Sequence, residues 1–151
     1  MAFKMPEATQ LVQMMDMMLG AETSAVVSED FDAATATHTA LYVDDDGETV
    51  ASCRCTLPTA AALGSALSMI PPGGAESMVE DKALTQVATE NLYEVMNIFS
   101  SLMMDDKTSH LKLMELQASN DASIEGESCA FVIDLGKYGT GHLLFNVAAS
   151  A

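Results

Sequence analysis

Apolar and polar residues recur at helical spacing most clearly in residues 82–104. Apolar residues that step by three or four positions form one stripe: Leu84, Ala88, Leu92, Val95, Phe99 and Leu102. A polar row steps in the same way and lies about 200° round the helix from the stripe. That row consists of Gln86, Glu90, Glu94, Asn97 and Ser101. The pattern predicts a long central helix with one side in the core and a polar side facing water.

Two further helices are predicted from apolar spacing and from helix-breaking residues. Residues 6–19 carry apolar side chains at positions 11, 14, 15 and 18, and Gly20 ends this N-terminal helix. Pro58 starts a short helix over residues 59–69. The sequence PPGG at residues 71–74 then predicts a break and a turn, after which the central helix begins between residues 75 and 81.

Six segments have the composition and alternation of β-strands. They are residues 24–28, 38–43, 48–57, 111–118, 129–135 and 141–148. The acidic turn 44–47 makes a hairpin of the second and third segments, and the turn 136–139 makes one of the last two. The helices do not alternate with the strands, which argues against a parallel sheet. We therefore expect a single α+β domain over residues 1–151, with a largely antiparallel sheet of five to six strands packed against the long central helix, the N-terminal helix and the short helix.

The third strand segment predicts a sheet that is covered on one face. Ala51, Cys53 and Cys55 fall on one side of this segment, while Ser52 and Arg54 fall on the other. Such alternation is typical of an antiparallel strand with one face in the core and one face toward water.

The cysteines and the N-terminus favour a cytoplasmic protein. The chain has three cysteines and no CxxC motif, so we expect buried thiols in a reducing compartment, with a Cys53–Cys55 redox pair as the alternative. Asp16 interrupts the apolar run near the N-terminus, which is unlike a signal peptide. No apolar stretch approaches the length of a membrane span.

The composition is strongly acidic, with 22 Asp and Glu against 6 Lys and Arg and a formal net charge of −16. This charge disfavours nucleic acid and anionic membranes as partners and favours proteins with basic patches. Arg54 is the only arginine in the chain, so a self-contained clamp for a phosphate is hard to build. Phosphate chemistry would need positive charge from a metal or from a partner.

Motifs for other kinds of chemistry are missing from the sequence. His38, His110 and His142 are not spaced as metal ligands. Tyr42 and Cys53 stand where a calcium-binding loop around residues 44–47 would need acids. There is no GxSxG, Walker A or GxGxxG pattern. We therefore expect no metal site and no cofactor bound by this chain.

The polar row of the central helix has two interpretations. The common one is a solvated face with no further role. This row, however, holds no Lys or Arg, so no i,i+4 ion pair supports it. Asn97 is also a poor helix former in a mid-helix position. A locally unfavourable residue at such a place is a hint of function.

The sequence EVMN at residues 94–97, with Glu90 one turn earlier, resembles the signature of the CheC/CheX/FliY family of chemotaxis phosphatases. That family places an acidic or Ser residue, then Glu, then Asn along one long helix. The methionine-rich first helix ending at Gly20, the acidic hairpin and the strand that runs into a proline-started helix are similar to single-copy CheX proteins. The resemblance covers most of the chain.

The resemblance implies a phosphatase that acts on the aspartyl phosphate of a CheY-like response regulator. Asn97 would orient the attacking water, and Glu94 would pair with a lysine of the regulator. Glu90 and Ser101 would contact the partner along the same helix face. The regulator would bring its own Mg²⁺, and the protein would be a homodimer.

Two alternatives stay open. The first is a non-catalytic CheX-like domain that docks a regulator or a flagellar component. Ile98 and Phe99 directly after the asparagine, and the lack of any proline after Pro72, favour this alternative because they depart from the family pattern. The second is an unrelated α+β domain in which the polar row is only a solvated surface.

Overall fold

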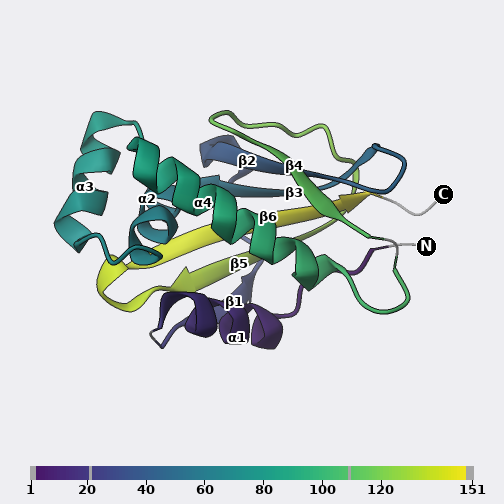
Figure 1. The fold of residues 1–151 in the computed structure, drawn as a ribbon, viewed down its shortest axis with the longest axis horizontal. Coiled ribbons are helices and arrows are strands. Elements are labelled where there is room, and N and C mark those ends of the chain that lie inside the picture. Colours follow the sequence, from purple (N-terminus) through teal and green to yellow (C-terminus); the bar gives the residue numbers. More distant parts are fainter. Residues whose placement is uncertain (1–2, 21, 109, 149–151) are drawn as a thin grey trace.

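The computed structural model describes residues 3–20, 22–108 and 110–148, which form one sheet and a set of helices (Figure 1). The elements run in the order α1 (Ala8–Leu19), β1 (Ser24–Ser28), β2 (Ala36–Val43), β3 (Thr49–Thr56), α2 (Leu57–Ala66), α3 (Pro72–Asp81), α4 (Gln86–Phe99), β4 (Lys112–Gln117), β5 (Gly126–Asp134) and β6 (Thr140–Ala148). Three short 3₁₀ helices join them: η1 (Ala33–Thr35), η2 (Ser100–Met103) and η3 (Gly136–Tyr138).

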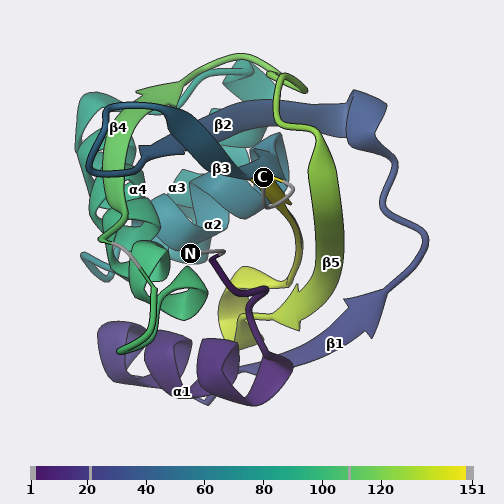
Figure 2. The ribbon, with the colours of Figure 1, turned by 90° about the vertical axis from the view of Figure 1, so that its right-hand side faces the viewer.

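The six strands form one sheet in the order β1-β5-β6-β3-β2-β4, and every neighbouring pair is antiparallel. Figure 2 shows this sheet strongly curled, with α2 and α4 on its concave side and α1 near the edge strand β1. The α+β class, the antiparallel sheet and both hairpins expected from the sequence are confirmed. The predicted strands lie within two to three residues of the observed ones, because their alternation and turn residues mark them clearly.

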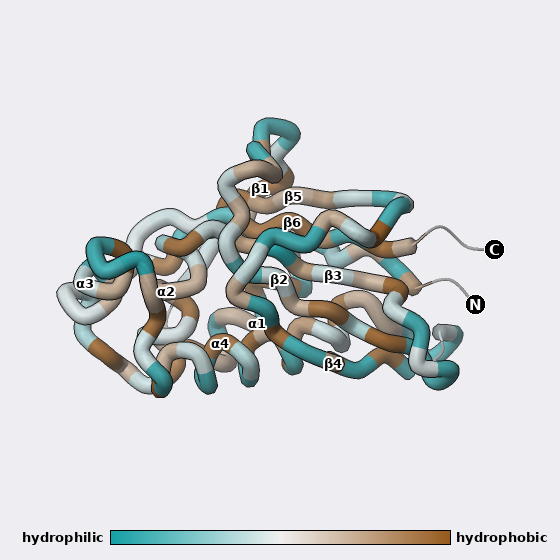
Figure 3. The backbone as a smooth tube through the Cα atoms, turned by 90° about the horizontal axis from the view of Figure 1, so that it is seen from above, coloured by the Kyte–Doolittle hydropathy of each residue, from teal (hydrophilic) through white to brown (hydrophobic). Residues whose placement is uncertain are grey.

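The core lies between the concave face of the sheet and the helices. It includes Leu92, Val95, Met96 and Phe99 of α4, all fully buried. The rings of Phe99 and Phe145 stand 6.0 Å apart, which joins α4 to β6. Figure 3 shows hydrophobic and hydrophilic residues alternating along α4, as expected of a helix with one face in the core. None of the described helices is both long enough and apolar enough to cross a bilayer.

The central helix is shorter than the apolar spacing predicts. Residues 72–81 form the separate helix α3, which ends at Lys82 in the left-handed conformation with φ 56°. Thr85 then caps α4, its Oγ1 accepting a hydrogen bond from the Ala88 N–H at 3.2 Å. Leu84, expected on the helical stripe, therefore lies in the linker between the helices. The predicted break at residues 71–74 instead opens α3, because Pro72 occupies a first-turn position, where proline is well tolerated.

The expectation of one solvated sheet face is wrong at β3. Cys53 and Cys55 are buried in the core, but Arg54 on the opposite face is also only 6% exposed. Two loops cover that convex face and are held there by hydrogen bonds. Asn120 accepts from Nη1 of Arg54 at 3.0 Å and donates to the Ala33 carbonyl at 2.8 Å. The alternation of residues along a strand predicts which side chains share a face, but it does not predict which loops cover that face.

Candidate functional site

The outer side of α4 carries three of the residues that the sequence singled out, Glu90, Glu94 and Asn97, and the fourth, Ser101, follows in η2. All four are exposed, whereas the opposite side of α4 is buried in the core. Residues three apart on a helix stand about 5–6 Å from each other at Cβ, so Glu94 and Asn97 are neighbours on this surface. Their side chains share one solvent-facing row, and their roles stay a prediction.

Three apolar side chains are exposed among these polar ones. Val87 is 52% exposed, Tyr93 39% and Ile98 36%. We call the exposed set Val87, Glu90, Tyr93, Glu94, Asn97 and Ile98 the α4 ridge. The sequence analysis treated Ile98 only as a departure from a family pattern and gave Val87 and Tyr93 no role. Exposed apolar groups between charged ones are typical of a surface that contacts another protein.

Two adjoining hollows lie along one flank of the ridge. A shallow hollow of about 590 Å³ is lined by Thr89, Glu90, Asn91, Tyr93, Glu94 and Leu116. A second of about 650 Å³ shares Thr89 and Leu116 with the first and extends to His38 and Lys82. Glu90 and Glu94 therefore border open space, into which a partner's side chains could fit. Asn97 and Ser101 do not line either hollow.

The two glutamates of the ridge have no cationic partner within the described part of the chain. Glu90 accepts one hydrogen bond, from the amide of Gln86 at 3.3 Å. No Lys, Arg or His side chain in the described ranges forms an ion pair with Glu90 or Glu94. A carboxylate without a counterion on its own chain is free to pair with a cation supplied by another protein.

Two contacts fix the position of α4 against α2. Nδ2 of Asn91 donates to the carbonyl of Gly64 at 2.8 Å and to Oγ of Ser68 at 2.6 Å. Small residues of α2, including Ala61 and Gly64, let the two helices approach closely. The ridge is therefore presented by a helix that is anchored along its inner side.

The cysteines offer no reactive group to this surface. Cys53 and Cys55 are fully buried, and burial raises the pKa of Cys55 to about 12 and also raises the pKa of Cys53. Both thiols therefore stay protonated at neutral pH, which agrees with the buried-thiol interpretation. Within the described ranges, no three or more His, Cys, Asp and Glu side chains come together as a metal site would require.

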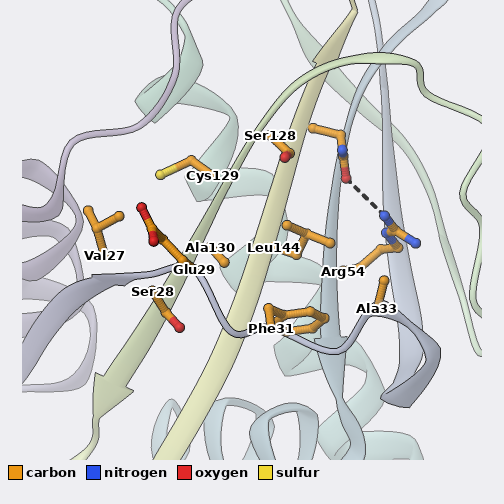
Figure 4. Close-up of a pocket in the computed structure, with 11 residues that line it drawn as sticks. Val27, Ser28, Glu29, Phe31, Ala33, Arg54, Ser128, Cys129, Ala130 and Leu144 are labelled. Atoms are coloured by element: carbon orange, nitrogen blue, oxygen red, sulfur yellow. Dashed lines mark hydrogen bonds between the residues drawn. The ribbon is translucent and has the colours of Figure 1, made fainter.

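A separate hollow of about 530 Å³ lies on the convex face of the sheet, remote from α4 in sequence and built from other elements (Figure 4). Val27, Ser28, Glu29 and Phe31 border it on one side, and Nη2 of Arg54 donates to Asn146 at 3.2 Å near its other side. Arg54 is thus engaged by neutral amides and held away from the ridge.

Comparison with known proteins bears on the fold. Neither a protein-family model nor a curated protein matches the sequence. Solved structures do match. FliY from Thermotoga maritima superposes with a TM-score of 0.65 at 11% identity, over 91% of this chain and 82% of FliY. The chemotaxis protein CheX from Desulfovibrio desulfuricans gives a TM-score of 0.52 at 12% identity, over 92% of this chain and 94% of CheX. This chain has the CheC/CheX/FliY-like fold.

A further solved structure has the same fold. A chain of the FliM–SpeE complex from H. pylori gives a TM-score of 0.66 at 6% identity, over 93% of this chain and 81% of that chain. At these identities the likeness establishes the architecture, and the resemblance stated from the sequence is confirmed at that level. Activity and partners have to be argued from the α4 ridge itself.

Proposed function

We propose that this protein dephosphorylates the aspartyl phosphate of a CheY-like response regulator in the cytoplasm. Glu94 pairs with a lysine of the regulator, and Asn97 orients the water that attacks the phosphorus. Glu90 of α4 and Ser101 of η2 contact the regulator beside them. The single observation that supports this most is the placement of Glu94 and Asn97 side by side on an exposed, anchored helix face, where Glu94 forms no ion pair with any cation in the described part of the chain.

The chemistry suits an uncharged amide at the point of attack. An amide both donates and accepts hydrogen bonds, so Asn97 can hold a water with a lone pair directed at the phosphorus. A carboxylate at the same place would repel the phosphoryl oxygens. Phosphoryl transfer depends mainly on positioning and charge stabilisation, and little covalent chemistry is required of the protein.

The positive charge needed for this reaction comes from the regulator. The chain has a net charge of −16, and its one arginine is buried on the convex face. The regulator's lysine and its Mg²⁺ would neutralise the charge that develops on the phosphoryl oxygens. This division of roles requires no metal or cofactor on the present chain.

The test is the decay of phosphorylated regulators with and without this protein. Each CheY-like regulator of the host is phosphorylated with acetyl phosphate and separated from the excess acetyl phosphate. The loss of its phosphoryl group is then measured over time. The unaltered protein should accelerate decay of its cognate regulator. Asn97→Ala should remove about 10²-fold or more of that acceleration, and Glu94→Ala should weaken it chiefly through binding. Gln13→Ala on α1 and Glu76→Ala on α3, both exposed, are matched controls and should change nothing.

A second candidate function is docking without hydrolysis. The exposed Val87, Tyr93 and Ile98 favour it, because they add apolar contact area that a purely catalytic row does not need. The fold likeness to a chain of the FliM–SpeE complex agrees with a role in assembly. Binding of a regulator or flagellar component that leaves phosphoryl decay unchanged would select this function over the first. No binding and no change in decay with any regulator would reject both.

We also propose that the protein forms a homodimer through β1. This edge strand has the uncharged sequence SAVVS, and Val26 and Val27 are 64% and 60% exposed. The other edge strand, β4, carries Lys112 and Glu115, the kind of charge that discourages edge pairing. Antiparallel pairing of two β1 strands centred on Val26 would place Val26 opposite Val26 of the second copy and Ser24 opposite Ser28.

A further inference from the structure

The backbone hydrogen bonding of α4 changes at Asn97. In an α-helix the N–H of Ser100 would donate to the carbonyl of Met96, four residues earlier. Here the backbone N–H groups at the C-cap donate to the carbonyls of Asn97 and Ile98, and the 3₁₀ helix η2 begins at Ser100. Oγ of Ser100 donates to the same Asn97 carbonyl at 2.7 Å. The Met96 carbonyl, which belongs to a fully buried residue, is not among the acceptors of these cap N–H groups.

Tyr42 of β2 supplies a donor to this carbonyl. Its hydroxyl donates to the Met96 carbonyl at 2.6 Å, and both residues are 0% exposed. Tyr42 lies on β2, the strand next to the edge strand β4, and pairs with Ala51 of β3 and Leu113 of β4, with a register shift beside it in each ladder. Burial raises the pKa of Tyr42 well above its usual value, so the phenol is protonated and remains a donor at neutral pH.

These contacts hold the backbone of Asn97 on both sides. The carbonyl of Met96 belongs to the peptide unit that carries the Asn97 N–H, and Tyr42 fixes it from the sheet. The carbonyl of Asn97 belongs to the next peptide unit, and Ser100 fixes it from within the helix end. We propose that Tyr42 and Ser100 are positioning residues, which set the direction in which the Asn97 side chain leaves α4. This inference rests on the proposed phosphatase function.

The hydroxyl of Tyr42 is not needed to fill the core. A phenylalanine would occupy almost the same volume and would require no hydrogen-bond partner, which makes tyrosine the more demanding choice at a fully buried site. By itself, the buried hydroxyl of Tyr42 would lack an acceptor, and the Met96 carbonyl would lack a side-chain donor. The hydrogen bond between them satisfies both groups. The pairing occurs at the peptide unit directly before the proposed catalytic residue, where small errors of direction are costly to the reaction.

The test compares two tyrosines that both donate to a backbone carbonyl. Tyr42→Phe removes the contact at Met96, and Tyr138→Phe removes the contact between Tyr138 and the Ile70 carbonyl, which is remote from Asn97 in sequence. The initial rate of regulator dephosphorylation is measured over a range of concentrations of phosphorylated regulator, and Tm is measured for each variant. We expect Tyr42→Phe to lower kcat about tenfold with KM within twofold, and Tyr138→Phe to change neither.

Ser100→Ala is the second variant and does not depend on the folding of Tyr42→Phe. It removes the Oγ contact while the Ser100 N–H remains, so kcat should fall by about threefold at unchanged KM. If Tyr42→Phe and Ser100→Ala accelerate decay as much as the unaltered protein does, the positioning role alone is rejected. No acceleration by the unaltered protein would reject the proposed function and this role together. If Tyr138→Phe lowers kcat as much as Tyr42→Phe does, the effect is a general loss of stability, and the inference is also overturned.

Discussion

Gly64 of α2 faces Ala88 of α4 with no room for a side chain between them. A Cβ atom added to Gly64 would lie 2.5 Å from the carbonyl oxygen of Ala88 and 3.1 Å from its Cβ. Side chains essentially never approach a backbone oxygen so closely, so the glycine sets the distance between α2 and α4. The position of the α4 ridge over the sheet depends on this contact and on the Asn91 hydrogen bonds beside it.

Gly64→Ala should destabilise the protein because the added methyl group must push α4 outward. We expect the free energy of unfolding to fall by about 1–3 kcal/mol, as for other overpacked sites. Gly73→Ala in α3 is the control, because nothing lies within 4 Å of the added Cβ. It should stabilise by about 0.5–1 kcal/mol through helix propensity. Urea unfolding measures both; equal effects of the two substitutions would contradict the packing argument.

Lys82 ends α3 in a conformation that suits glycine. Its φ of 56° is in the left-handed region, and its side chain is exposed. Lys82→Gly should therefore raise the free energy of unfolding by about 1 kcal/mol. Lys82→Ala removes the charge but keeps the strained Cβ, so it should bring no such gain. Thermal unfolding of the two variants separates the backbone effect from the loss of the lysine.

Native protein should react with a thiol reagent at Cys129 alone. Cys129 is partly exposed, whereas Cys53 and Cys55 are fully buried. Iodoacetamide at pH 8 followed by mass spectrometry should find one modified cysteine, and three after unfolding in urea. Modification of Cys53 or Cys55 without unfolding would show that the core opens locally.

The same buried thiols predict a loss of stability in alkali. In the unfolded chain Cys55 ionises near its ordinary pKa of 9.0, but in the folded protein its pKa is about 12. Between these two values the unfolded state loses the proton and the folded state keeps it, so the free energy of unfolding falls as the pH rises from about 9. Cys55→Ala should reduce the slope of stability against pH in this window; an unchanged slope would argue against the shift.

Val26→Lys should convert the proposed homodimer to a monomer. A lysine in the middle of β1 would meet its symmetry mate across the paired strands, and like charges opposite each other disfavour pairing. Met114→Lys is the control, since Met114 is 46% exposed on β4 at the other edge of the sheet. Sedimentation analysis should find the unaltered protein and Met114→Lys dimeric and Val26→Lys monomeric. A dimer that survives Val26→Lys would place the interface elsewhere.

Alternation and helical spacing were sufficient to locate all six strands and the exposed row of α4. They overestimated the central helix, since Leu84 continues the apolar spacing across a break that no Gly or Pro marks. The left-handed conformation of Lys82 depends on tertiary structure, which local sequence patterns do not report. The role of Tyr42 was missed for the same reason, because its partner Met96 is 54 residues away in the chain.

The burial of Arg54 beneath the loops of the convex face has a consequence for turnover. The remaining Lys and Arg residues of the chain are all lysines, and within residues 3–20, 22–108 and 110–148 none of them forms an ion pair with the glutamates of the α4 ridge. In the proposed reaction, orthophosphate released beside Asn97 would meet no guanidinium fork on this chain and would depart across a surface of its own sign. On this proposal, we expect added orthophosphate not to compete with the phosphorylated regulator for the α4 ridge.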